Sequence, residues 1–139
     1  GGWRLLVVPS QLQAELDTPP IEYFREIADR DLQPGDRAIL CLPQPTWIYA
    51  HKYRRHGGRF DETDLLYLRE QVFAPRGVEV RVFLAGDLHH YRRHEEVAPA
   101  GSVPIQKITA GGGGAFVHPT HDEDVERLVE DPAATPEPA

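Results

Sequence analysis

One short segment carries the residue types best suited to metal chemistry. The apolar run 78–84 alternates with charged residues, a pattern typical of a β-strand, and it is followed by Gly86, Asp87 and His89. Ligands and metals collect at the carboxyl ends of strands in open α/β sheets, so Asp87 and His89 are candidate ligands of one divalent ion. A loop histidine held by hydrogen bonds is the alternative, because no CxxC or HExxH pattern fixes a coordination shell.

Other histidines flank a glycine run in the same part of the chain. His90 and His94 precede the run, whereas His118 and His121 follow it. Histidine is the commonest side-chain metal ligand, and a neighbouring carboxylate fixes its tautomer. We nevertheless expect His90 and His94 to be surface residues.

Two further segments have residue types that bind anions. The run 111–114 follows an expected strand, and its N–H groups could approach an anion, although it matches neither common nucleotide-binding pattern. A tightly turned connection is the simpler interpretation. The aromatic and basic segment 47–59 could steer a phosphate or stack on a base, but a loop that packs its aromatic rings on the domain is favoured. The candidates for neutralising phosphate charge are Lys52, Arg54, Arg55 and Arg92.

The composition narrows the class of protein. The 139 residues are 40% hydrophobic and 27% charged, which is typical of one globular domain. A net charge of -7 argues against a general nucleic-acid binder. No apolar run approaches membrane-spanning length, so we expect this piece to be soluble and, by default, cytoplasmic. Cys41 lies in an apolar run and is expected to be a buried thiol rather than a catalytic one.

The chain is expected to be a piece of a longer protein. It contains no methionine and opens almost directly on an apolar run. Residues 1–121 are expected to belong to one domain, followed by a short helix at 122–131 and a disordered tail at 132–139.

Strands and helices are expected to alternate. The apolar patterns predict buried strands at 5–8 and 38–42, strands at 78–84 and 105–109 with a loop between them, and helices that begin near 17–20 and near 61–63. The second helix should end near Phe73 and bury Leu65, Leu66, Leu68, Val72 and Phe73. Residues 43–45 must be extended or turning, and 47–58 are expected to be irregular. This order predicts an α/β fold with at least some parallel pairing.

Three segments together resemble a known family. Residues 83–91, FLAGDLHHY, and 108–121, ITAGGGGAFVHPTH, are similar to the C-terminal half of calcineurin-like metallophosphoesterases, and 36–47 is similar to a preceding core strand. The resemblance covers roughly residues 3–121. It implies half of a four-layer α/β/β/α sandwich, with a mixed sheet and helices on one face. It also implies that the intact domain holds two divalent ions (Mn, Fe or Zn) and hydrolyses phosphate mono- or diesters.

The resemblance transfers to only a few residues. The family's Gly-His-x-His motif matches the segment 86–89, so His89 is implied as a metal ligand and Asp87 as a possible one. Aspartate in place of histidine would favour harder ions. Gln44 stands where the family has a histidine and is at best a weak oxygen donor. The candidate contacts to substrate or to the metal ligands are Gln44, His90, Tyr91, Gly112, Gly113 and His118.

The catalytic residues cannot be assigned from this chain. The family's early motifs, Asp-x-His, Gly-Asp-x-x-Asp and Gly-Asn-His, are absent and would precede Gly1. The expected partners are a phosphoester substrate and the missing N-terminal half, and the chain alone should be inactive. Two alternatives remain open: a non-catalytic binding module on a degenerate phosphoesterase scaffold, and a nucleotide-binding domain that uses the glycine run.

Overall fold

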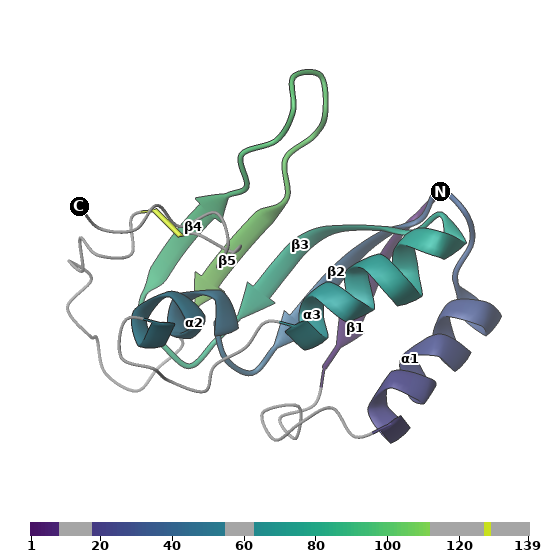
Figure 1. The fold of residues 1–139 in the computed structure, drawn as a ribbon, viewed down its shortest axis with the longest axis horizontal. Helices are drawn as coiled ribbons and strands as arrows, with labels where there is room; N and C mark the ends of the chain where they lie inside the picture. The colour runs from purple at the N-terminus through teal and green to yellow at the C-terminus, as the bar shows by residue number, and fades with distance from the viewer. Residues whose placement is uncertain (9–17, 55–62, 112–126, 129–139) are drawn as a thin grey trace.

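A mixed five-stranded sheet organises the computed structural model, which describes residues 1–8, 18–54, 63–111 and 127–128 (Figure 1). The strand order is β1-β2-β3-β5-β4, in which β4 runs antiparallel to β5 and the other neighbours are parallel. The strands are β1 (Trp3–Val7), β2 (Arg37–Leu42), β3 (Glu79–Ala85), β4 (Tyr91–Glu95) and β5 (Gln106–Ala110). The predicted α/β fold with parallel pairing is confirmed.

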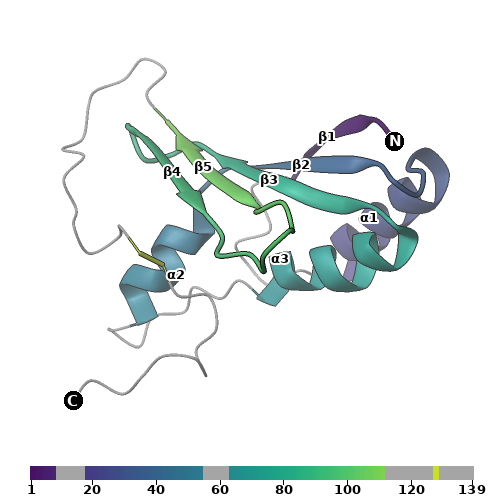
Figure 2. The same cartoon turned by 90° about the horizontal axis from the view of Figure 1, so that it is seen from above.

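The helices gather on one face of this sheet, as the view from above shows (Figure 2). They are α1 (Thr18–Asp31), α2 (Thr46–Arg54), α3 (Thr63–Tyr67), the π-helix η2 (Leu68–Phe73) and the 3-10 turn η3 (Ala74–Arg76). The core lies between them and the sheet, where the Phe24 and Phe73 rings meet edge-on with centroids 6.4 Å apart. The predicted helix near 61–73 is present, but Leu66 is more than a third exposed rather than buried.

Asp36 joins the end of α1 to the first two strands. The turn before it needs Gly35, whose φ is +87°. The Asp36 carboxylate accepts the N–H groups of Gly2 (2.7 Å) and Gln33 (3.0 Å) and pairs with Arg4 Nε at 2.9 Å. These donors, with the backbone bonds first, lower the pKa of Asp36 to about 2.

A β-bulge in β3 changes which side chains face the core. Ala38 pairs with Val80 but Ile39 pairs with Val82, so Arg81 is an extra residue in β3. Val80 faces the helices before the bulge, and Phe83 and Ala85 face them after it. The predicted alternation of 78–84 is therefore wrong beyond Arg81.

Three other sequence expectations are corrected. Residues 47–54 are not irregular, because they belong to α2, which buries Trp47 and Ile48. The segment after β3 contains β4, whose largely polar sequence gives no apolar alternation. The first strand is not buried, because β1 is an edge strand with Leu5 and Val7 about two-thirds exposed.

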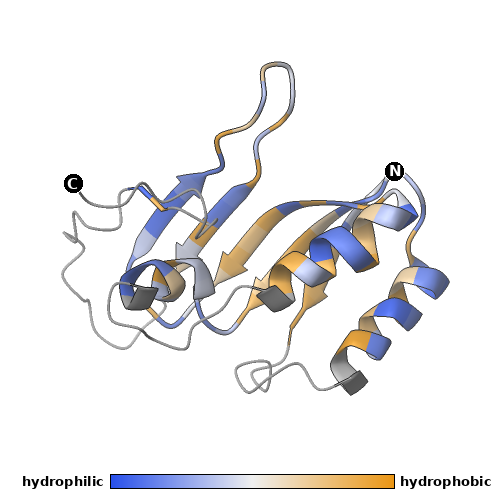
Figure 3. Cartoon of the chain, in the orientation of Figure 1, coloured by the Kyte–Doolittle hydropathy of each residue, from blue (hydrophilic) through white to orange (hydrophobic). Residues whose placement is uncertain are grey.

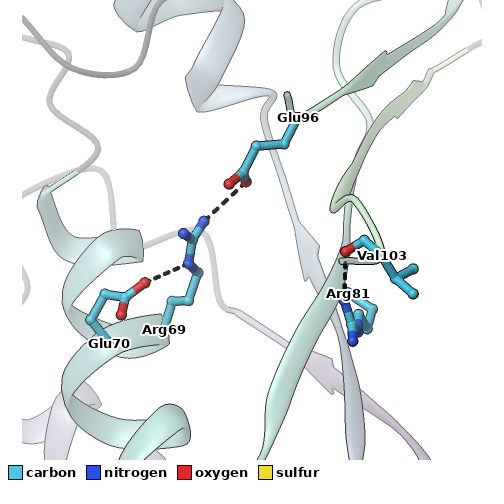
Figure 4. A network of polar contacts seen from close by, with 5 residues as sticks. All are labelled: Arg69, Glu70, Arg81, Glu96 and Val103. Carbon is cyan, nitrogen blue, oxygen red and sulfur yellow. Dashed lines mark hydrogen bonds and ion pairs between the residues drawn. The ribbon is translucent and has the colours of Figure 1, made fainter. Parts of the chain in front are cut away.

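The connection between β4 and β5 projects away from the sheet and is anchored at its base (Figure 1). Arg69 of η2 bonds Glu70 and reaches Glu96 at 3.2 Å, while Arg81 Nη1 donates to the Val103 carbonyl at 2.6 Å (Figure 4). These contacts attach the hairpin to both η2 and β3.

No described helix covers the outer face of the sheet (Figure 2), and the strands β1, β2 and β3 are composed largely of apolar residues (Figure 3). Trp3, Leu5 and Val7 are exposed on the outer face, and Ile39 and Leu84 are half-exposed. In the described part of the chain, one apolar face of the sheet is therefore exposed. The expected helix at 122–131 lies outside the described residues apart from 127–128, and the expected tail lies outside them entirely.

Candidate functional site

Three parallel strands end at the same edge of the sheet, which we call the carboxyl edge. Leu42 of β2 pairs with Ala85 of β3, and Ala85 pairs with Thr109 of β5. The segments that follow are 43–45, 86–90 and Gly111. A Cβ added to Gly86 would lie 3.7 Å from the Pro43 carbonyl oxygen, so the first two segments are adjacent. The carboxyl ends of parallel strands are where α/β proteins place ligands.

The loop 86–90 is tightly turned. The Leu88 N–H bonds the Gly86 carbonyl at 2.9 Å, and the His90 N–H bonds the Leu88 carbonyl at 2.7 Å. Asp87 adopts a left-handed conformation with φ of +69°, the one described non-glycine residue with positive φ. Such a conformation costs on the order of 1–3 kcal/mol and persists only where the surrounding structure holds it. Aspartate tolerates it better than most residues.

A hydrogen bond from α2 orients the Asp87 carboxylate. The Tyr49 hydroxyl donates to Asp87 Oδ2 at 2.7 Å, although the two residues are 38 positions apart. Helix α2 begins directly after Pro45, and the N–H groups of Ile48 and Tyr49 bond the Pro45 carbonyl. Asp87 is exposed, so its other carboxylate oxygen can bind a cation or accept a hydrogen bond from a ligand.

Gly111, the first residue of the glycine run, packs against the loop 86–90. Its N–H donates to the His90 carbonyl at 3.1 Å. A Cβ at this position would lie 2.0 Å from the Leu88 carbonyl oxygen, so only glycine fits. The first glycine of the run therefore has a steric role at the carboxyl edge, and residues 112–114 lie outside the described part of the chain.

The remaining sequence candidates fall into two groups. Gln44, His89 and His90 are half-buried at the carboxyl edge, and Tyr91 is exposed at the start of β4. His90, in the loop, and His94, on β4, which pairs with β5, are both half-buried. The candidates outside the described residues are Arg55, Gly112, Gly113, His118 and His121.

Two basic candidates lie on elements that reach the same edge. Lys52 is exposed on α2 three residues after Tyr49, which places both on neighbouring positions of the helix surface. Arg92 of β4 is half-buried opposite Thr109 of β5. A further basic candidate, Arg54, is the last residue of α2.

The donor set at the carboxyl edge fits part of a metal site. Asp87 offers a carboxylate and His89 an imidazole, ligands that suit Mn, Fe or Zn. In the described segments, no group of three or more His, Cys, Asp or Glu residues could hold a metal ion. Asp87 and His89 would therefore supply two ligands of a larger shell.

The surroundings of Cys41 and Lys107 indicate structural roles for both residues. Cys41 is half-exposed on the outer face of β2 rather than buried, and desolvation raises the pKa of its thiol, which disfavours a nucleophilic role. Lys107 of β5, which sequence reasoning missed, is 7% exposed, and its Nζ lies 5.7 Å from the Trp47 ring centroid and 5.4 Å from that of Phe83. A charged residue with two aromatic rings at such distances is stabilised by cation–π attraction.

None of the described helices combines the length and the apolarity that a membrane-spanning helix needs. Comparisons of the chain with protein-family models, with curated proteins and with solved structures found no match. Function is therefore inferred from the residues and the geometry of the carboxyl edge.

Proposed function

We propose that this chain is the C-terminal part of a metal-dependent phosphoester hydrolase and that its carboxyl edge supplies ligands to a divalent metal centre. The observation that carries the proposal is the placement of Asp87 and His89 on one tight loop at the ends of parallel strands. The Tyr49 hydroxyl and the Gly111 N–H hold this loop from two sides. Rigid support of this kind is what a metal ligand requires.

Each residue at the carboxyl edge has a distinct role in this proposal. Asp87 and His89 would hold a divalent ion, which when bound polarises a phosphoryl oxygen and acidifies water. Tyr49 fixes the direction of the carboxylate before any ion binds. Lys52 and Arg92 carry positive charge on elements that reach the same edge, where they would offset the charge of a bound phosphate.

The outer face of the sheet supports the larger architecture. Half-exposed Ile39 and Leu84 and exposed Leu5 lie on a face that no described helix covers. A second sheet packed about 10 Å away would bury such a face, as in a four-layer α/β/β/α sandwich. In this proposal the second sheet and the remaining metal ligands come from a further part of a longer polypeptide.

The isolated chain tests where the site is assembled. We expect weak binding of Mn²⁺ or Zn²⁺ in calorimetry and no hydrolysis of phosphate mono- or diesters, because two ligands cannot complete a four- to six-coordinate shell. In the longer protein, His89→Ala and Asp87→Asn should lower metal content and turnover together. The matched control is Asp29→Asn, which changes an exposed carboxylate on α1 that pairs with Arg76 of η3. Tight binding of two ions by the isolated chain would contradict the proposal.

A non-catalytic binding module is the second candidate. The features that favour it are Asp87 and Gln44, which stand where the resembled family has histidines. A longer protein that binds phosphoesters or metal but turns over neither mono- nor diesters, with its fold intact, would support this candidate over the hydrolase.

A further inference from the structure

The outer edge of β1 offers an unused row of main-chain hydrogen-bonding groups. Among the described strands β1 pairs with β2 alone. The Gly2 carbonyl accepts from Arg37 and the Val8 N–H donates to Cys41, so the even-numbered residues direct their main-chain groups toward β2. Main-chain groups alternate in direction along a strand, so those of Trp3, Leu5 and Val7 point to the open edge.

This edge carries few of the devices that usually protect edge strands. Natural sheets guard an edge with lysine, proline or a bulge, whereas β1 reads WRLLV and pairs with β2 in continuous register. Its one charge, on Arg4, is engaged by Asp36 at 2.9 Å. Trp3, Leu5 and Val7 are 55%, 65% and 66% exposed. The edge is therefore both open and apolar.

Open space adjoins the strand along its whole length. A cavity of about 580 Å³ is lined by all five residues of β1 and, on the α1 side, by Tyr23, Ile27 and Arg30 among others. Helix α1 packs on η2, through Phe24 and Phe73, so it does not close the edge of the sheet. A further strand added beside β1 would lie next to this cavity.

We propose that β1 pairs antiparallel with β1 of a second copy of this chain, about a twofold axis at Leu5. In this register Leu5 faces Leu5 of the partner copy, and Trp3 faces the partner's Val7. These are the residues whose main-chain groups point outward, so each facing pair exchanges both of its hydrogen bonds. The pairing is isologous, as a twofold interface requires.

The side chains of the proposed pair are compatible on both faces. On the outer face, Trp3, Leu5 and Val7 would form one apolar ladder with the same residues of the second copy, which lowers their exposure. On the helix face, Arg4 would face Leu6 of the partner, so the two arginines are not directly opposed. The strand of the second copy would extend the sheet in its own plane, at the open edge of β1 rather than at the carboxyl edge. The proposed pairing therefore goes beyond the proposed hydrolase function and does not depend on it.

Cross-linking tests the register. In a Cys41→Ser background, Leu5→Cys should give a disulfide-linked dimer on oxidation, because facing Cα atoms of such a pair lie about 5.5 Å apart, within disulfide range. Leu6→Cys, the matched control, should not cross-link, since Leu6 would face Arg4. Equal cross-linking of the two variants, or none by Leu5→Cys, would overturn the proposed register.

Sedimentation equilibrium tests the assembly itself. The unaltered chain should dimerise in the micromolar range, and Leu5→Lys should be monomeric because two lysines would oppose each other at the axis. Leu84→Lys, on the outer face of β3 away from the edge, should remain dimeric. A monomeric unaltered chain, with the edge then left for another strand, would overturn the proposal. So would a dimer that Leu84→Lys dissociates and Leu5→Lys does not, because this result indicates stacking of the two outer faces.

Discussion

Asp87 combines a left-handed backbone, an exposed carboxylate and a hydrogen bond from a distant tyrosine. A positive φ at a non-glycine residue is uncommon and is found disproportionately where a side chain must be aimed. The Tyr49 hydroxyl fixes the carboxylate after the backbone has directed it away from β3. This residue is therefore the most constrained of the candidate ligands.

Removing the Tyr49 hydroxyl should weaken metal binding without unfolding the chain. Tyr49→Phe keeps the ring and loses the 2.7 Å hydrogen bond to Asp87. Partners that orient a ligand are typically worth 10–100-fold, so we expect affinity for Mn²⁺ to fall about tenfold. Paramagnetic broadening of the His89 ring signals during a Mn²⁺ titration measures it. Tyr23→Phe, on α1, is the control, and an equal affinity of Tyr49→Phe and the parent would refute the positioning role.

Asp36 should make the stability of the chain sensitive to acid. Its pKa is about 2 in the folded chain and 3.8 without its partners, so its contribution is fully present above 3.8 and is lost as the pH falls toward 2. Thermal unfolding followed by circular dichroism should show a steeper decline of the melting temperature over this range in the parent than in Asp36→Asn. The variant should also melt lower near neutral pH. Parallel declines would mean that other carboxylates dominate.

At the scale of elements, Gly111 couples β5 to the loop after β3. Gly111→Ala should destabilise the chain by about 1–3 kcal/mol, because its Cβ would meet the Leu88 carbonyl at 2.0 Å and force the loop to move. Urea denaturation measures the loss. Gly86→Ala is a control within the same site, since its Cβ would make an ordinary 3.7 Å contact with Pro43. A similar loss in both variants would contradict the steric role of Gly111.

Local periodicity predicted those elements whose apolar residues face one core. The strand at 38–42 and the helix that buries Phe24 and Ala28 were predicted on this basis. Asp87 and His89 lie on one loop because they are two positions apart in the sequence, and their role as ligands stays a prediction. The bulge at Arg81 could not be predicted, because it is defined by pairing with β2.

Two other elements were missed for physical reasons that are equally specific. Strand β4 reads YRRHE and is held by pairing with β5 rather than by an apolar face. Helix α2 buries Trp47 and Ile48, but it also contains basic residues, so its sequence shows no clear apolar face. The Tyr49–Asp87 contact depends on α2, so it could not be predicted either.

At the scale of the whole molecule, the two faces of the sheet should respond differently to the same change. Leu40→Ala removes a fully buried side chain and should cost about 2–5 kcal/mol. Leu84→Ala, on the outer face, should cost much less because Leu84 is only half-buried. Chemical denaturation of both variants provides the measurement. Equal losses would show that the outer face is covered within the chain itself.

The strand order also imposes a sequence of folding events. Because β5 lies between β3 and β4, β4 cannot pair with β3 and must wait for the chain to return. The hairpin of β4 and β5 is the local unit, and the bond from the Gly111 N–H to the His90 carbonyl extends its ladder. Docking of this hairpin on β3 then completes the carboxyl edge, after α2 and β3 are in place. Pulse-labelled hydrogen exchange should find that the Gly111 amide becomes protected with the β4–β5 hairpin and before the amides that join β5 to β3.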